Sequence, residues 1–197
     1  MKVGVLALQG DVPEHLRALA GVVPERSLVP VLRASDLEEL DALLLPGGES
    51  TTIARLLAES GVWTALAHRL ADGFPVLGTC AGLILLSRDL APSVAGRDPP
   101  TFGVLDVRVR RNDYGTQRES FEAPVRVTGV GKRAFPGVFI RAPRILGVGA
   151  DAQPIAWRGD EVVGVRSGVV WGLAFHPELA GDPRVHRAFL RATVRRR

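Results

Sequence analysis

The chain contains a single cysteine, Cys80, among its 197 residues. A single cysteine excludes a disulfide within the chain, and no cluster of histidine and cysteine has metal-ligand spacing, so the sequence predicts no metal site. Because a free thiol persists in a reducing compartment, we expect the protein to be cytoplasmic.

Long apolar runs are missing as well. No stretch approaches the roughly 20 apolar residues that are needed to span a membrane. The first apolar run, residues 3–8, ends at Gln9 and is shorter than the apolar region of a secretory signal peptide. We interpret it as a buried first strand and expect no association with a membrane.

The excess of positive charge is small: the chain has 25 lysines and arginines and 21 acidic residues, which gives a formal net charge of +4. The densest cluster is the arginine run at 195–197, which is expected to be a solvated helix end where cations suit the helix dipole. No platform of aromatic and basic residues accompanies the charge, so we expect no nucleic-acid partner.

Short apolar runs alternate with helical patterns through the first half of the chain, which is typical of a parallel sheet covered on both faces. Buried strands are expected at residues 3–8, 27–32, 42–46 and 75–79. Helices are expected from Val12 with Asp11 as the cap, from Ser50 to about Ser60, and over residues 81–87.

From Thr101 onward, apolar and charged residues alternate, and β-branched segments such as residues 168–175 are separated by glycine and proline. This pattern predicts antiparallel strands with one solvated face, followed by a helix that begins at Asp182. The sequence therefore predicts one α/β domain over residues 1–197, with three α/β/α layers, a central mostly parallel sheet and an antiparallel extension in the second half.

Cys80 lies within the sequence GTCAG, at the junction of a predicted strand and a predicted helix. Glycines two positions before and after a nucleophile are typical of an elbow, a tight turn in which a Cβ would collide with neighbouring backbone. The helix start favours a thiolate, and the N–H of Ala81 is placed to bind an oxyanion. A free cysteine can instead be a small buried hydrophobe, and this pattern alone leaves both interpretations open.

The four histidines differ in their surroundings. His15, His68 and His186 lie in predicted helices and are expected to be surface or packing residues. His176 directly follows an apolar strand and precedes Pro177 and Glu178. Because residues two apart in extended backbone project to the same side, Glu178 can orient His176 as a base for Cys80, although a buried structural pair is the alternative.

The third motif is PGGESTT, residues 46–52, which follows a predicted strand. Adjacent glycines allow backbone N–H groups to approach a ligand. A phosphate-binding loop is disfavoured because that motif ends in Gly-Lys-Ser/Thr, and because Glu49 would repel a phosphate.

With GTCAG, FHPE and PGGEST together, the chain resembles the class I, triad-type glutamine amidotransferases, which have a flavodoxin-like fold. It resembles most closely the glutaminase subunits of pyridoxal 5′-phosphate synthase, through VGVLALQGD, PGGESTT, SFEA and FIRAP, nearly from end to end. The sequence departs from the pattern of that family at Asp113, Tyr114, Thr116 and Ala180.

The resemblance implies that the enzyme hydrolyses L-glutamine to L-glutamate and ammonia, without a cofactor. It implies that Cys80 attacks the side-chain amide to form a thioester, that His176 transfers the proton and that Glu178 orients His176. It further implies an oxyanion hole at Gly48 and Ala81, and glutamine contacts at Gly48, Glu49, Ser50, Arg111, Ile140 and Arg141. Either arginine can hold the substrate carboxylate, and Glu49 can hold the ammonium group.

The same resemblance implies a partner, a PdxS-type synthase subunit in a large hetero-oligomer that receives the ammonia for vitamin B6 synthesis. The chain has only two lysines, Lys2 and Lys132, and neither lies in a Schiff-base motif, so the carbonyl chemistry is expected in the partner. The turn that contains Gly10 is expected to help form the docking surface.

Three alternatives remain at this point. One is a glutaminase subunit that serves another pathway, for example that of histidine. Another is a non-enzymatic relative of the DJ-1 group, which is disfavoured because that group lacks the HPE motif. The third is a catalytically silent interaction subunit, which is disfavoured because every triad position is filled.

Overall fold

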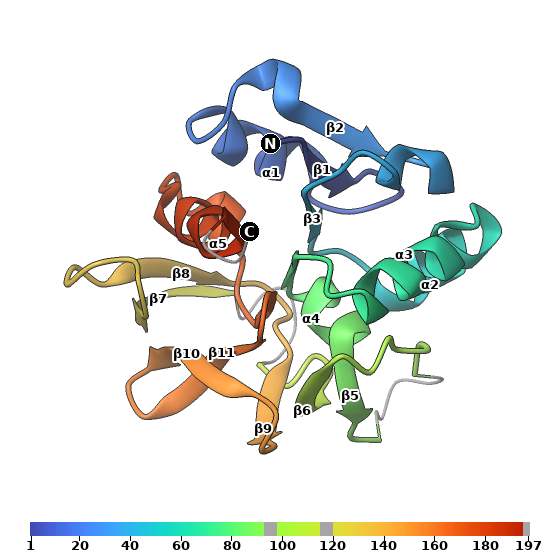
Figure 1. Ribbon diagram of the computed structural model, residues 1–197. Coiled ribbons are helices and arrows are strands. Elements are labelled where there is room, and N and C mark those ends of the chain that lie inside the picture. The colour runs from blue at the N-terminus through green and yellow to red at the C-terminus, as the bar shows by residue number, and fades with distance from the viewer. Residues whose placement is uncertain (93–97, 115–119, 195–197) are drawn as a thin grey trace.

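The computed structural model describes residues 1–92, 98–114 and 120–194. The arginine run at 195–197 and Thr116 lie outside these ranges. A nine-stranded sheet has the order β2-β1-β3-β4-β12-β11-β10-β7-β8 (Figure 1). Its parallel part consists of β1 (Val3–Leu6), β2 (Leu28–Val31), β3 (Ala42–Leu45), β4 (Val76–Thr79) and β12 (Val170–Leu173).

The parallel strands are buried as their sequences predict. Every residue of β1, β3, β4 and β12 is buried, because helices cover both faces of this part of the sheet. Figure 1 places α1 and α5 on one side of β1 and β3, and α2, α3 and α4 on the other. The helices are α1 (Val12–Ala20), α2 (Ser50–Glu59), α3 (Val62–Ala71), α4 (Ala81–Leu86) and α5 (Arg184–Val194).

The antiparallel extension is confirmed in the second half of the chain. It contains β7 (Phe121–Val127), β8 (Phe135–Phe139), β10 (Gln153–Arg158) and β11 (Glu161–Ser167). Exposed and buried residues alternate along β8, as expected for a sheet with one solvated face. The predicted three-layer α/β/α class is therefore confirmed.

One strand assignment was wrong in direction. The segment at 168–175 was expected in the antiparallel extension, but β12 pairs in parallel with β4 and is antiparallel only to β11. Its uninterrupted burial fits this central position, because apolar residues cover both of its faces. The parallel part of the sheet therefore gains a strand from the far end of the chain.

A second sheet, with the order β5-β6-β9, was not predicted. It consists of β5 (Ser87–Leu90), β6 (Leu105–Arg110) and β9 (Arg144–Val148), and lies beside α4 (Figure 1). The first of these strands begins directly after α4, where the polar sequence SRDL gives no apolar alternation to indicate a strand.

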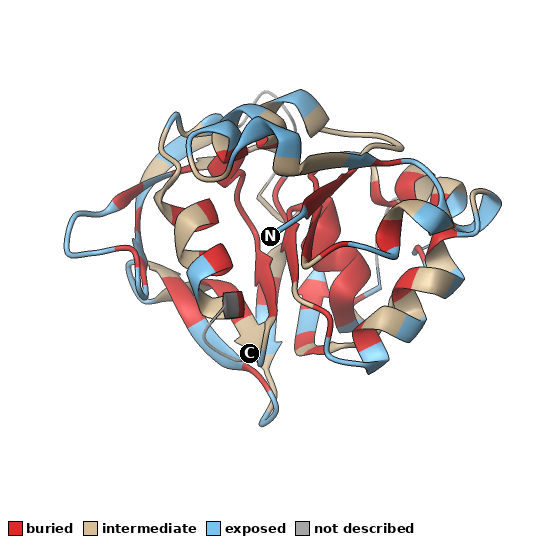
Figure 2. Cartoon of the chain, turned by 45° about the horizontal axis from the view of Figure 1, so that its top comes forward, coloured by how far each residue is buried: buried red, intermediate tan, exposed pale blue. Residues whose placement is uncertain are grey.

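Buried segments gather along the centre of the molecule and exposed ones on the outer helix faces (Figure 2). On α5, Val185 and Phe189 are fully buried. The helix begins after Asp182, whose side chain accepts a hydrogen bond from the backbone N–H of Arg184 at 3.0 Å. Across the described ranges, no helix is both long and apolar enough to cross a membrane.

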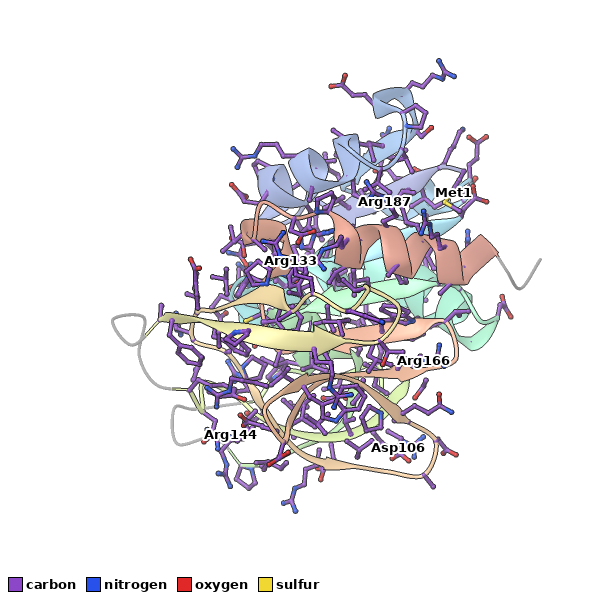
Figure 3. All side chains as sticks on the ribbon, turned by 90° about the vertical axis from the view of Figure 1, so that its left-hand side faces the viewer. Met1, Asp106, Arg133, Arg144, Arg166 and Arg187 are labelled. Atoms are coloured by element: carbon purple, nitrogen blue, oxygen red, sulfur yellow. The ribbon has the colours of Figure 1, made fainter. Side chains whose placement is uncertain are left out.

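The arginines are spread over several elements. Figure 3 shows Arg133, Arg144, Arg166 and Arg187 at separate places over one side of the molecule. Several arginines are paired with acidic neighbours, as for Arg144 and Asp113 at 3.1 Å. Some of the positive charge on this surface is therefore balanced locally.

Candidate active site

Strands β4 and β12 end side by side. Thr79 pairs with Leu173 in the parallel register, and the N–H of Cys80 donates to the carbonyl of Leu173 at 2.8 Å. Because adjacent parallel strands end at the same sheet edge, the residues that follow them meet there. Cys80 and His176, 96 positions apart in the sequence, thus line one cavity.

Cys80 occupies a strained elbow between β4 and α4. Its backbone has φ 47° and ψ −100°, a conformation that residues with a Cβ rarely adopt. A Cβ on Gly82 would lie 2.2 Å from the carbonyl oxygen of Leu45, and one on Gly78 would lie 2.6 Å from the carbonyl carbon of Gly82. Both glycines of GTCAG are therefore required by close backbone contacts, as the sequence predicts.

His176 and Glu178 form a buried pair. The Nδ1 of His176 lies 2.8 Å from Oε1 of Glu178, whose side chain is fully buried. The expected extended backbone is wrong, because Pro177–Leu179 forms a single 3-10 turn, η4, that begins at His176. Pro177 starts this turn, where its missing N–H costs nothing. The turn brings the carboxylate back to the ring.

Asp11 reaches the same ring nitrogen. Its Oδ2 lies 3.1 Å from Nδ1 of His176. Asp11 stands at the N-cap of α1 as predicted, but its side chain makes no capping hydrogen bond. The prediction of a capping role for this side chain was therefore wrong, because the carboxylate faces His176 instead.

The surroundings of His176 determine which nitrogen can act as a base. Carboxylates only accept hydrogen bonds, so Nδ1 must carry the proton shared by Glu178 and Asp11. Nε2 is then the basic nitrogen of the neutral ring; it is buried and has no hydrogen-bond partner in the described part of the chain. The ligand atoms of Asp11, His176 and Glu178 lie within 4.8 Å of one another, a spacing that a metal would also suit, but this proton already joins them.

The pKa of His176 is raised above its usual value of 6.5. Burial alone would lower it, but the contacts with Asp11 and Glu178 and the proximity of Cys80 outweigh burial. Burial raises the pKa of Glu178, while the contact with His176 opposes that rise. A protonated ring is thus favoured beside Cys80, and an imidazolium next to the sulfur suits nucleophilic catalysis by cysteine.

The loop after β3 brings Glu49 to the start of α2. Its Oε2 accepts hydrogen bonds from the hydroxyl of Thr51 and, at 2.7 Å, from the N–H of Thr52, so Glu49 caps the helix. Burial would raise the pKa of Glu49, but these hydrogen bonds lower it to about 2. Its other oxygen lies 3.3 Å from Nη2 of Arg111. The carboxylate of Glu49 and the guanidinium of Arg111 therefore place opposite charges side by side in the site.

The two residues expected to bind an oxyanion lie on neighbouring elements. Ala81 is the first residue of α4, where a backbone N–H has no partner within the helix. Gly48 lines the cavity, and the carbonyl of Gly47 before it accepts from the N–H of Asp11 at 3.2 Å. The turn at the start of α1 thus holds the loop that carries Gly48.

The cavity at this sheet edge has a volume of about 340 Å³. Twelve residues line it, and eight of them are predicted site residues: Gly48, Glu49, Ser50, Cys80, Arg111, Ile140, Arg141 and His176. Glu178 lies behind His176, outside this lining. Sequence reasoning had not assigned Gln9, Asp11, Ile84 or Asn112 to the cavity.

The two predicted arginines differ in their contacts. Arg111 contacts Glu49 and, at 3.4 Å, Asp98, and its side chain is 11% exposed. Arg141 is exposed and forms no ion pair with any residue that the structure describes. The carbonyl of Ile140, which precedes it, lies 3.9 Å from the Sγ of Cys80.

The departures from the family pattern lie beside the site. Asp113 forms an ion pair with Arg144. The centroid of the Tyr114 ring lies 5.5 Å from the centroid of the Phe139 ring. These two residues therefore pack the loop after β6. Thr116 falls outside the described residues.

The sequence did not indicate the two histidines, His15 and His186, that lie next to the pair of His176 and Glu178. His15 and His186 are fully buried and contact each other, and His15 also contacts Thr79. The expectation of packing residues holds for these two, while His68 is exposed. No local pattern indicates the contact, because it joins residues 171 positions apart.

A solved structure described as a crystal structure of glutamine amidotransferase has the same fold. It superposes with a TM-score of 0.87 at 44% sequence identity, and the match covers 98% of this chain and all of that one. The fold is therefore that of the class I glutamine amidotransferases, as the motifs predict.

The model of the SNO glutamine amidotransferase family matches residues 5–195, and the chain belongs to this family. A relative from Pyrococcus furiosus, named pyridoxal 5′-phosphate synthase subunit PdxT, is 47% identical over 98% of this chain and all of its own. A relative of the same name from Streptomyces coelicolor is 51% identical over 95% of this chain and 91% of its own.

Proposed function

We propose that this chain is the glutaminase subunit of a pyridoxal 5′-phosphate synthase, with residues 1–197 forming one glutaminase domain. The relatives of that name match nearly the whole chain, which favours this pathway over that of histidine. The observation that carries the chemistry is the cavity in which Cys80 and His176 meet, with Glu178 2.8 Å behind the imidazole.

In the proposed mechanism, the thiolate of Cys80 attacks the side-chain carbonyl of glutamine. The imidazolium of His176 gives its Nε2 proton to the departing amide nitrogen, so ammonia leaves and a thioester remains. His176 then takes a proton from water, which hydrolyses the thioester to glutamate. The N–H groups of Gly48 and Ala81 stabilise the oxyanion in both steps.

We propose that Glu49 and Arg111 bind the backbone end of glutamine. Their charged atoms lie 3.3 Å apart, which matches the adjacent ammonium and carboxylate groups of an amino acid. A guanidinium can hold a carboxylate through two hydrogen bonds, and the low pKa of Glu49 keeps its charge for the ammonium. Ser50, Ile140 and Arg141 line the rest of the cavity.

The partner is a PdxS-type synthase subunit, which receives the ammonia within a larger assembly. The turn at residues 9–11 lies at the cavity, and the side chain of Gln9 accepts from the N–H of Glu49 at 2.9 Å. We therefore propose that the synthase docks at this turn, where a movement caused by docking would be transmitted to the loop that carries Gly48. A cytoplasmic location fits a mechanism that needs its lone thiol reduced.

The central experiment measures glutamate release from glutamine by the purified chain, with and without a PdxS-type synthase. We expect the synthase to stimulate release, Cys80→Ala to abolish it, and His176→Asn to reduce it by at least about a hundredfold. Circular dichroism of each variant controls for folding. Wild-type turnover in both variants would contradict the mechanism.

A second experiment follows the nitrogen. The complex is given glutamine labelled with ¹⁵N in the amide, together with an excess of unlabelled ammonium. If ammonia passes directly to the synthase, the vitamin product keeps the label. Dilution of the label by the external ammonium would contradict direct transfer, while leaving the glutaminase reaction intact.

A further inference from the structure

His15 is a buried ionisable residue that the mechanism above does not use. It comes from the middle of α1 and is fully buried. Its Nε2 lies 3.4 Å from Oε2 of Glu178 and 3.2 Å from the hydroxyl oxygen of Thr79. One imidazole therefore contacts both the residue before the nucleophile and the residue that orients the base.

The second oxygen of Glu178 needs a hydrogen-bond donor. Oε1 receives the proton of His176, but Oε2 is buried and has no ideal hydrogen bond with any residue that the structure describes. Leaving a carboxylate oxygen buried without a donor is costly. The Nε2 of His15 is the nitrogen within ion-pair distance of this oxygen.

The contacts of His15 indicate where its proton lies. Because a carboxylate only accepts, Nε2 must carry the proton if it serves Glu178, and Nδ1 is then an acceptor. The Nε2 of His186 lies 3.1 Å from that Nδ1 and can donate to it. The remaining nitrogen, Nδ1 of His186, has no partner in the described part of the chain, which suits a bare nitrogen better than a buried N–H.

Burial favours the neutral form of both rings. Burial lowers the pKa of His15 well below 6.5, with further lowering by His186 and His176. Burial also lowers the pKa of His186 to about 4. A neutral ring carries one N–H, and the contacts are met when His186 donates to His15 and His15 donates to Glu178.

We propose that His15 is a positioning residue of the glutaminase site, which holds Glu178 and Thr79 through its Nε2–H and so sets His176 relative to Cys80. His186 fixes the tautomer of His15. The proposal rests on the proposed function, because it assigns a role within the same triad. Its physical basis is that a small displacement of a base from its nucleophile can cost about a hundredfold in rate.

The first test needs no variant. Two-dimensional ¹H–¹⁵N NMR of the histidine rings reports their tautomers and charges, and the chain has only four histidines to assign. We expect His15 and His186 to carry the proton on Nε2 and not to titrate between pH 5.5 and 8. A proton on Nδ1 of His15, or its titration in that range, would overturn the proposal.

The second test compares His15→Leu with His15→Gln, because glutamine keeps an N–H donor and leucine does not. We expect His15→Leu to lower kcat by about tenfold to a hundredfold with KM changed less than about twofold, and His15→Gln to recover most of the loss. His68→Leu, at an exposed position, is the control. Equal kcat in all four proteins would overturn the proposal.

Alkylation of Cys80 by iodoacetamide separates positioning from folding. The groups that face His176 are Asp11, Glu178 and Cys80. Loss of the N–H donor of His15 makes the ionised form of Glu178 less stable, because a hydrogen bond to a carboxylate favours its charged form. We therefore expect alkylation of folded His15→Leu to reach half its maximum rate at a higher pH than in the wild type. If the pH dependence of alkylation is unchanged, and kcat falls only in proportion to the fraction of folded protein, the role of His15 is purely structural.

If His15→Leu does not fold, the NMR result and the His15→Gln variant still decide the proposal. Failure of the proposed function is seen separately, since it requires Cys80→Ala to remain active. An inactive Cys80→Ala together with an unaffected His15→Leu would reject only the positioning role.

Discussion

The Oδ2 of Asp11 lies 3.1 Å from the Nδ1 of His176, the nitrogen that Glu178 also contacts. Two carboxylates therefore share one N–H. The side chain of Asp11 is 34% exposed, whereas that of Glu178 is fully buried. Asp11 is thus the member of the pair that solvent and a docked partner can reach.

The variant Asp11→Asn tests this contact. In a Cys80→Ala background, where the thiolate is absent, we expect Asp11→Asn to make His176 lose its proton at a lower pH, because one negative charge is removed. Titration of the ¹⁵N ring signals measures the change, with exposed His68 as the internal reference. An unchanged titration of His176 would show that the charge of Asp11 has no influence on the ring.

The variants Arg111→Gln and Arg141→Gln form a matched pair. We expect Arg111→Gln to raise the KM for glutamine by about tenfold or more with little change in kcat, because it removes a charged hydrogen bond to the substrate. Arg141→Gln should raise KM by less than about threefold. Steady-state kinetics with the synthase present measure both, and the reverse order would assign the carboxylate to Arg141.

The glycines of the elbow can be tested with alanine. A Cβ at position 82 would lie 2.2 Å from the backbone of Leu45, so Gly82→Ala should destabilise the fold by roughly 1–3 kcal/mol and displace Cys80. Gly147→Ala is the control, because no atom lies within 4 Å of its added Cβ. Urea unfolding and glutaminase activity measure both effects. Equal stability of the two variants would contradict the close contact.

The charge of Glu49 predicts a dependence of stability on pH. The folded-state pKa of Glu49 is lowered from 4.5 to about 2 by Thr51 and Thr52, despite the opposing effect of burial. A group with a lowered folded-state pKa stabilises the fold above its unfolded pKa, and this contribution is lost as the pH falls through the folded pKa.

We therefore expect Glu49→Gln to be less stable than the wild type at pH 6 and to approach it as the pH falls from about 4.5 to 2. The difference at pH 6 should stay below about 1 kcal/mol, because the 39% exposed side chain is screened by solvent. Urea unfolding at several pH values measures it, with Glu59→Gln at the end of the same helix as the control. A difference that grows with acid would give the opposite sign and refute the interpretation.

Local patterns in the sequence determined much of this protein. The buried strands, the helix that starts at Ser50 and the elbow of GTCAG all depend on neighbouring residues, because burial on two faces, helix capping and backbone crowding act over a few positions. His176 and Glu178 are only two positions apart, so their contact could be predicted even though the backbone between them was assigned wrongly.

Only the tertiary structure decided which distant residues meet. The place of β12 beside β4 brings His176 to Cys80, and strand order depends on long-range pairing that no local pattern encodes. Likewise, the packing of α1 against α5 and η4 turns Asp11 away from its own helix and brings His15 to His186 and Glu178. Helices that bury their apolar faces against one sheet enclose these polar side chains together, and buried polar groups need hydrogen-bond partners, so they contact one another.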